Sequence, residues 1–261
     1  MKKNLLLFLF VPLISAGQSY AFDIKGLQPL APYGVYSTFS AESLKENTSG
    51  IAIGIERSNQ PNYNRFIAQF AYGIKDNIEI DLTIPYITDW NDSADNLEDV
   101  SLGLKHRVIN EDRYGPAIAY ILNISFPTGK KDLTTEGSFG GGLIISKKVG
   151  PVYGHINLLY SRPGTNRFKD DVTIAAGIDF SASNSFKILS ELYGKKGYSG
   201  RLDNIEWRFG YRLQTTENIY TTVGAGIDIK NSSPEYRLML SLTYLFRHEA
   251  VNIKRIYERE D

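Results

Sequence analysis

The sequence predicts an all-β protein, a closed antiparallel transmembrane β-barrel of about twelve strands. Three observations support this prediction. Apolar and polar residues alternate in segments of about ten residues, the connections between segments alternate between short and long, and aromatic residues gather at segment ends. A membrane-spanning strand needs one face for lipid and one for a polar interior, and residues 50–246 repeat that pattern.

Residues 1–21 are typical of a secretory signal peptide, because two lysines precede a short apolar run, residues 5–14. A run of roughly ten residues interrupted by Pro12 is too short to cross a hydrocarbon core, which needs about 20. We therefore expect cleavage after Ala21 and export to a bacterial-type outer membrane. The expected partners are outer-membrane lipids and, during biogenesis, the barrel assembly machinery.

The composition excludes several classes of protein. The chain has no cysteine, so a disulfide scaffold and a thiolate metal site are ruled out. Its 29 basic residues balance 29 acidic ones, and a nucleic-acid binder would show a basic excess. Seventeen tyrosines, thirteen phenylalanines and a mean hydropathy of −0.24 are too polar for membrane helices and suit a barrel. We expect no cofactor.

The alternation is clearest in residues 78–86, where the even positions are apolar while Glu79, Asp81 and Thr83 take odd ones. Such a strand presents one apolar and one polar face. The same pattern recurs along the chain and fixes the other strands. The expected strands are 50–58, 64–75, 77–87, 98–109, 115–126, 138–148, 151–161, 171–180, 185–195, 203–214, 218–230 and 235–246.

The connections alternate in length. Short turns near 75–77, 110–114, 149–150, 181–184 and 215–217 separate mostly longer polar links at 59–63, 88–97, 127–137, 162–170, 196–202 and 231–234. Outer-membrane barrels have short periplasmic turns, longer external loops and an even strand number. This pattern predicts that both ends of the barrel face the periplasm.

A secreted soluble β-sandwich also alternates, so alternation by itself does not decide between the two folds. Strands of about ten residues exceed the five or six typical of soluble sheets. Aromatic residues at the strand ends match the girdles of membrane barrels. Those residues are Tyr72, Tyr86, Phe126, Tyr160, Phe180, Phe186, Tyr236 and Phe246.

Two segments lie outside the predicted barrel, which spans 50–246. Residues 22–49 are punctuated by proline and glycine and rich in aromatics, and we interpret them as an N-terminal strap that enters the lumen. A disordered periplasmic leader is the alternative. The plug candidates are Pro32, Tyr33, Tyr36 and Phe39. Residues 247–261 are mostly charged and are expected to form a short periplasmic tail.

Four motifs carry a resemblance to a known family. These are residues 32–42 (PYGVYSTFSAE), 70–79 (FAYGIKDNIE), 84–86 (IPY) and 126–129 (FPTG). The chain resembles the outer-membrane transporters linked to the meta-pathway of phenol degradation. The motifs are turns and strand ends, so the resemblance implies the fold strongly and uptake of small, aromatic or hydrophobic solutes weakly.

By strand parity, a set of polar and charged side chains should face the interior. They are Glu79, Asp81, Lys105, Arg107, His155, Asn157, Asp179, Lys187, Glu191, Glu206, Arg208, Arg212, Asp228 and Arg237. One interpretation is a channel for small solutes through a mixed-charge lumen. The other is a lumen closed by salt bridges, giving a structural or adhesion barrel whose loops bind a partner.

A lipid-modifying enzyme is a third possibility and is not favoured. Such an enzyme would need a serine nucleophile beside a histidine base. His106 shares the lipid-facing parity but has no serine beside it, His155 points inward, and His248 lies in the tail. The acidic residues within 89–99 lack the glycine and spacing of a calcium loop and are expected to be solvated, so no metal site is predicted.

Overall fold

The computed structural model describes residues 26–59, 62–90, 94–130, 133–166, 170–196, 202–230 and 236–247. Over these residues the chain forms thirteen strands. They are β1 (Thr48–Asn59), β2 (Asn62–Lys75), β3 (Ile78–Trp90), β4 (Ala94–Leu97), β5 (Val100–Ile109), β6 (Ala117–Phe126), β7 (Ser138–Val149), β8 (Val152–Pro163), β9 (Asp171–Ser181), β10 (Phe186–Lys196), β11 (Leu202–Gln214), β12 (Ile219–Asp228) and β13 (Tyr236–Arg247). No helix in this part of the chain is long and apolar enough to cross a membrane.

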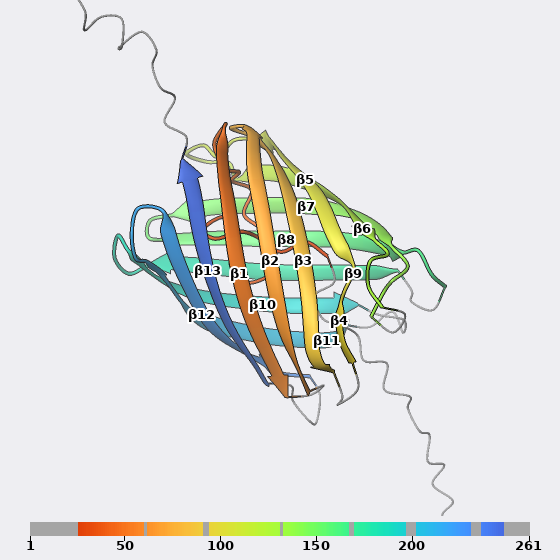
Figure 1. Cartoon of the computed structure of the whole chain (residues 1–261). Helices are drawn as coiled ribbons and strands as arrows, with labels where there is room; N and C mark the ends of the chain where they lie inside the picture. Colours follow the sequence, from red (N-terminus) through yellow and green to blue (C-terminus); the bar gives the residue numbers. More distant parts are fainter. Residues whose placement is uncertain are drawn as a thin grey trace, which may run out of the picture.

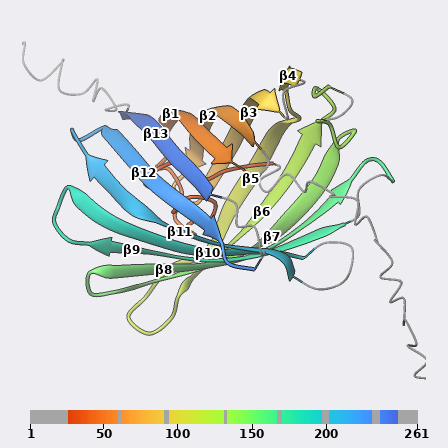
Figure 2. The same ribbon diagram turned by 90° about the horizontal axis from the view of Figure 1, so that it is seen from below.

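The sheet closes on itself as a barrel (Figures 1 and 2). Neighbouring strands pair antiparallel in chain order, except that β5 pairs with β3 and β4 lies beside the end of β3. The first strand closes the barrel by pairing with the last, from Thr48 opposite Arg247 to Ser58 opposite Arg237. Closure leaves no open edge on the twelve wall strands, and this is the arrangement that a membrane barrel requires.

The predicted fold class is confirmed, and β4 is the difference. The sequence predicts one loop over 88–97, whereas Ala94–Leu97 folds back to pair with β3, placing Leu97 opposite Tyr86. This segment lacks the alternation that marked the other strands. Its backbone pairing to β3 does not depend on which side chains it carries. The predicted signal peptide lies outside the described residues, and so does the predicted periplasmic tail except for Arg247, which belongs to β13.

The outer surface of the barrel is apolar along every wall strand. Side chains such as Ile53 and Leu238 are more than 60% exposed, and they stand on the opposite face from buried neighbours such as Glu56 and Arg237. An exposed apolar band on a barrel is the surface that faces lipid.

The eight strand-end aromatics stand at the two ends of this band, on the outer face of the wall. On the side of the short turns are Tyr72, Phe180, Phe186 and Phe246, and on the side of the longer connections are Tyr86, Phe126, Tyr160 and Tyr236. The two groups are placed as the two interfacial girdles of a membrane barrel are placed.

Candidate functional site

Residues 26–44 lie inside the barrel, between the wall formed by β1–β3 and the wall formed by β7–β10, and residues 45–47 are exposed at its turn side (Figures 1 and 2). We call residues 26–47 the strap. Within the described residues, its only strand-like backbone pairing is a single antiparallel β-bridge between Gly34 and Phe39. Its other backbone groups must therefore find partners elsewhere, and many bind side chains of the wall.

Glu191 of β10 is the strongest single anchor of the strap. Its Oε2 atom accepts hydrogen bonds from the backbone N–H of Tyr36 (3.1 Å), Ser37 (2.8 Å) and Thr38 (2.8 Å), and from Thr38 Oγ1 (2.8 Å). Its Oε1 atom accepts from Arg208 Nη1 at 2.9 Å. Hydrogen bonds to a buried carboxylate are stronger than neutral ones, so this contact fixes the middle of the strap.

Two neutral side chains continue the anchoring toward the turn side. Asn157 of β8 accepts from Phe39 N at 2.6 Å and donates to Phe39 O at 2.9 Å, which satisfies both backbone groups of that residue. Ser146 of β7 accepts from Ala41 N at 2.8 Å. The side chains of Phe39 and Ala41 pack on inward apolar residues of β6 and β7, namely Ala117, Ala119, Ile121 and Ile144.

Charged side chains hold the strap on both sides of this middle section. Glu79 of β3 accepts from Leu44 N at 2.6 Å and pairs with Lys105 at 2.8 Å. Arg212 of β11 donates to Gly34 O at 2.8 Å. The wall therefore presents carboxylates to strap N–H groups and a guanidinium to strap carbonyl oxygens.

Glycines in the wall make room for the strap. Tyr36 lies against Gly210 of β11 and Gly224 of β12, which pair with each other, and its hydroxyl donates to Val223 O at 3.3 Å. A Cβ atom added to Gly224 would lie 2.6 Å from Tyr36 Cζ, closer than real Cβ atoms approach. A glycine at this position is thus required by the close approach of the ring.

A chain of alternating acids and bases crosses one side of the lumen, with successive N···O distances between 2.6 and 3.6 Å. Its members in order are Glu98, Arg65, Glu56, Arg237, Glu206, Arg208 and Glu191. The strand β12 lies between Arg237 and Glu206 and places Gly226 there, so the two side chains meet above a residue without a Cβ. Every charge in this chain has an opposite charge beside it, as burial requires.

The predicted interior residues lie on the inner face of the wall. Twelve of the fourteen are buried, and Arg107 and Lys187 are half-buried near the turn side. Arg107 donates to Asp76 O at 2.9 Å, and Lys187 pairs with Asp179 at 3.0 Å. The buried twelve are Glu79, Asp81, Lys105, His155, Asn157, Asp179, Glu191, Glu206, Arg208, Arg212, Asp228 and Arg237. Of the plug candidates, Phe39 is buried, while Pro32, Tyr33 and Tyr36 are half-buried.

Sequence reasoning missed three members of the charge chain. Glu56 and Arg65 stand at inward positions of β1 and β2, so the alternation of inward and outward residues along these strands could have identified them. The third, Glu98, was expected in a solvated acidic loop. That expectation is wrong for Glu98 and Asp99, which are 3% and 8% exposed. Glu98 binds Arg65 Nε at 2.6 Å, and Asp99 accepts from both the N–H and the hydroxyl of Thr135.

A serine and a histidine do meet inside the barrel. Ser146 Oγ lies 2.8 Å from His155 Nδ1, with both residues at most 2% exposed. The same hydroxyl accepts from Ala41 N, so the strap covers it. A nucleophile must reach its substrate, and this pair has no exposed face to receive one.

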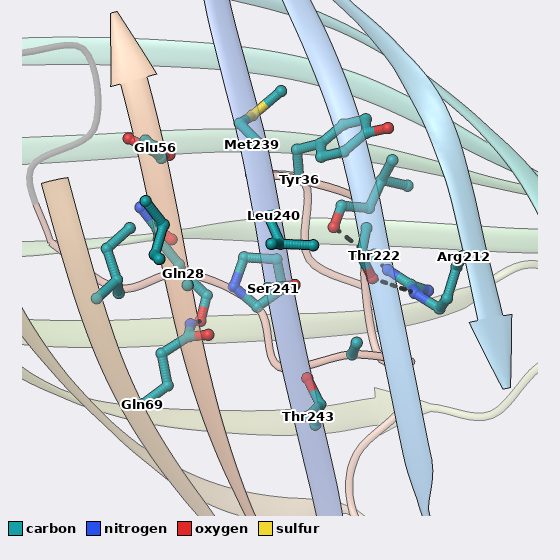
Figure 3. A pocket seen from close by; sticks show the side chains of 16 residues that line it. Gln28, Tyr36, Glu56, Gln69, Arg212, Thr222, Met239, Leu240, Ser241 and Thr243 are labelled. Carbon is teal, nitrogen blue, oxygen red and sulfur yellow. Dashed lines mark hydrogen bonds between the residues drawn. The ribbon is translucent and has the colours of Figure 1, made fainter. Parts of the chain in front are cut away.

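A small hollow remains between the strap and the wall (Figure 3). It measures about 50 Å³ and is lined by residues of the strap and of β1, β2, β11, β12 and β13. A buried water needs at least about 10–15 Å³, so the hollow has room for about three to five waters. The strap and the charge chain therefore leave only a narrow space on this side of the lumen.

The closed antiparallel sheet, its apolar outer surface and its polar interior define a transmembrane β-barrel. The chain belongs to the family described as "Putative MetA-pathway of phenol degradation", whose model matches residues 50–248. That range covers the wall and leaves out the 32–42 motif of the strap.

Solved structures with the same fold include the COG4313 outer membrane channel from Pseudomonas putida F1 (13% identity, TM-score 0.61, covering 79% of this chain and 98% of that chain). They also include the KdgM porin (11% identity, TM-score 0.60, covering 76% of this chain and 99% of that chain). A third is the NanC porin (8% identity, TM-score 0.58, covering 74% of this chain and 98% of that chain). At these identities the likeness shows the fold. A comparison with curated proteins finds no match.

Proposed function

We propose that this protein is an outer-membrane channel that passes small solutes through a mixed-charge lumen, and that the strap constricts the lumen. The observation that carries the proposal is the position of the strap, which is held in the lumen by side-chain contacts rather than by a sheet ladder. A wall strand could not leave without opening the barrel, whereas a segment of this kind can detach or shift while the wall stays closed. The solved channels of the same fold support the proposal.

The barrel, rather than an enzyme active site, is the functional unit in this proposal. The Ser146–His155 pair is covered by the strap and is assigned a structural role. Aromatic compounds are the finer candidate for the solute, supported by the description of the family. Uptake of phenol by cells that carry or lack the protein would test that finer statement, and equal uptake would overturn it.

Recordings from planar bilayers test the channel directly. The intact protein is compared with a variant that lacks residues 26–46, a deletion that leaves β1 complete from Thr48. We expect small conductance steps from the intact protein and larger ones from the deletion variant. A heat-modifiable gel shift checks that both barrels are folded. No conductance from either folded form would overturn the proposal.

One observation favours a second function. The charge chain and the strap fill the lumen so closely that the hollow of Figure 3 holds only a few waters. A closed barrel of this kind would serve a structural or adhesive role, with its longer connections binding a partner. The recordings from the intact protein separate the two functions, because a closed structural barrel does not conduct with its strap in place.

A further inference from the structure

Small side chains interrupt the apolar outer surface of the barrel on three neighbouring strands. Gly154 of β8, Ala176 of β9 and Ser190 of β10 all stand at outward positions, where most wall residues are isoleucine, leucine or aromatic. A groove of about 610 Å³ opens over these residues on the outside of the wall. It is more than ten times as large as the hollow of about 50 Å³ inside the lumen. We call it the outer groove.

Large apolar side chains form the walls of the outer groove. Ile156, Ile178 and Leu192 line it, and each is about half exposed, at 56%, 47% and 48%. Trp207 of β11 closes its far end, directly opposite Leu192 in the strand register. The outer groove therefore offers a mostly apolar surface within the band that faces lipid.

A hydrogen bond holds the indole of Trp207 in place. Its Nε1 atom donates to Ser190 Oγ at 3.0 Å, across the pair of strands β11 and β10. An N–H group without an acceptor is costly in hydrocarbon, and tryptophan usually lies at the membrane interface for this reason. The bond to Ser190 lets this indole stand in the middle of the wall and present its carbon atoms to the outer groove.

The other end of the outer groove lies on the side of the short turns and carries a positive charge. Lys147 of β7 lines this end, and its Nζ atom donates to Asp112 O at 2.6 Å and to Gly115 O at 3.0 Å. The same atom pairs with Glu111 at 3.5 Å. These contacts keep the ammonium group at the level of the turns while the stem of the side chain borders the groove. The groove thus runs from the level of the lipid headgroups toward Trp207 in the hydrocarbon.

The position and shape of the outer groove favour one occupant, a lipid acyl chain. The groove opens in the lipid-facing band, so acyl chains are its neighbours. An empty groove would leave its lining without van der Waals partners, and a flexible chain of methylene groups can follow it. A second copy of the barrel would present a rigid convex wall, which covers a groove without filling it. A phospholipid on the turn side would place its phosphate near Lys147 and its chain toward Trp207.

We propose that the outer groove is a binding site for one acyl chain of a phospholipid in the leaflet on the turn side. The groove holds this lipid more tightly than the lipids around the rest of the wall. The inference goes beyond the proposed channel function and does not depend on it, because the strap and the charge chain lie on the inner face of the wall.

Fluorescence quenching by a brominated lipid measures whether a chain stays in the outer groove. The protein has two tryptophans, so Trp90→Phe leaves Trp207 as the only reporter. This variant is folded into bilayers of phosphatidylethanolamine brominated along its acyl chains and is then extracted into a detergent without bromine. We expect Trp207 to remain quenched after extraction, because the bound lipid stays with the barrel. Mass spectrometry of the extracted barrel should show the same lipid bound.

A reporter on another part of the wall gives the first control. Phe70 of β2 is 40% exposed on the outer face, close to the 43% of Trp207. Phe70→Trp, made together with Trp90→Phe and Trp207→Phe, places the only indole there. Its fluorescence should recover fully on extraction, because the detergent replaces lipids that are not held in a groove.

Filling the outer groove gives the second test. A Cβ atom added to Gly154 would meet nothing closer than 3.8 Å, so Gly154→Leu places its side chain in the groove without a backbone clash. We expect the retained lipid to fall at least about tenfold, which corresponds to ~1.4 kcal/mol of affinity. Ala68→Leu, at an outward position of β2, should leave the retained lipid unchanged. The heat-modifiable gel shift should be the same in all these variants, because the hydrogen bonds of the wall are intact.

Three results would overturn the proposal. If Trp207 recovers as fully as the indole of Phe70→Trp, the outer groove holds no lipid. If Gly154→Leu retains as much lipid as the parent in a barrel with a normal gel shift, the lipid is bound elsewhere. If light scattering shows a dimer of barrels and Trp207 recovers fully, a second copy covers the groove. The channel proposal is tested separately by conductance and stands or falls independently of these results.

Discussion

Glu191 gives the sharpest test of how the strap is held. In Glu191→Gln, the single amide oxygen can face either the strap or Arg208, but not both, and the amide NH₂ then opposes the donors on the other side. Breaking a buried charge pair by removing one partner costs about 3–5 kcal/mol. If that cost falls on the docked strap, the detached population rises by about 10²-fold to about 4,000-fold.

Thiol labelling reports that population. The chain has no cysteine, so a Val35→Cys substitution places one thiol in the strap, at a side chain that is buried in the docked state. When detachment is fast relative to labelling, the labelling rate follows the detached population. We expect Glu191→Gln to raise the rate by about two orders of magnitude or more.

The control is Glu111→Gln, which makes the same change in charge at an exposed turn, where Glu111 pairs with Lys147 at 3.5 Å. This variant should label at the rate of the parent. A rise of less than about threefold in Glu191→Gln, which corresponds to ~0.7 kcal/mol, would refute the reasoning that this carboxylate anchors the strap.

Three further predictions follow from the same contacts. Gly224→Leu should expel Tyr36 and raise labelling at Val35→Cys, whereas Gly54→Leu, which fills open space, should leave labelling unchanged. Gly226→Val should place a side chain between Arg237 and Glu206 and so lower the temperature at which the barrel unfolds in the gel-mobility shift. Gly154→Val, on the outer face of β8, should not lower that temperature. Equal unfolding temperatures for the two variants would contradict the role of Gly226 as the open point where the two side chains meet. Arg65→Met should destabilise the barrel by about 3–5 kcal/mol in urea titrations, because Glu98 loses the partner of its buried charge and Glu56 keeps only Arg237. Adding Glu98→Gln to that variant should recover part of the loss.

The wall could be predicted from the sequence because lipid and lumen impose opposite demands on successive residues. The pattern in 78–86 identified β3 as a membrane strand, and the observed strand ends at Trp90. The strand β4 could not be predicted in this way, since Ala94–Leu97 pairs with β3 through its backbone and carries no repeating pattern.

The interior could be predicted only as a set of inward positions. Parity identified Arg208 and Glu206 as inward residues, but it could not tell which partner each would meet. Arg237 reaches Glu206 across an intervening strand because Gly226 stands between them, and Arg65 meets Glu98 from a connection rather than from a strand. Such pairings depend on the register of the closed barrel and on connections that fold over its mouth.

The central claim is that the docked strap limits passage through the lumen, and a reversible lock tests it most directly. A Cβ atom at Gly177 would lie 2.8 Å from Val35 Cγ2, which brings Val35→Cys and Gly177→Cys within disulfide reach, where Cβ atoms are about 3.5–4.5 Å apart. Single-channel current is recorded from this double variant before and after reduction. We expect small, steady steps when the disulfide is closed and larger, fluctuating steps after reduction. Identical currents in the two states would contradict it.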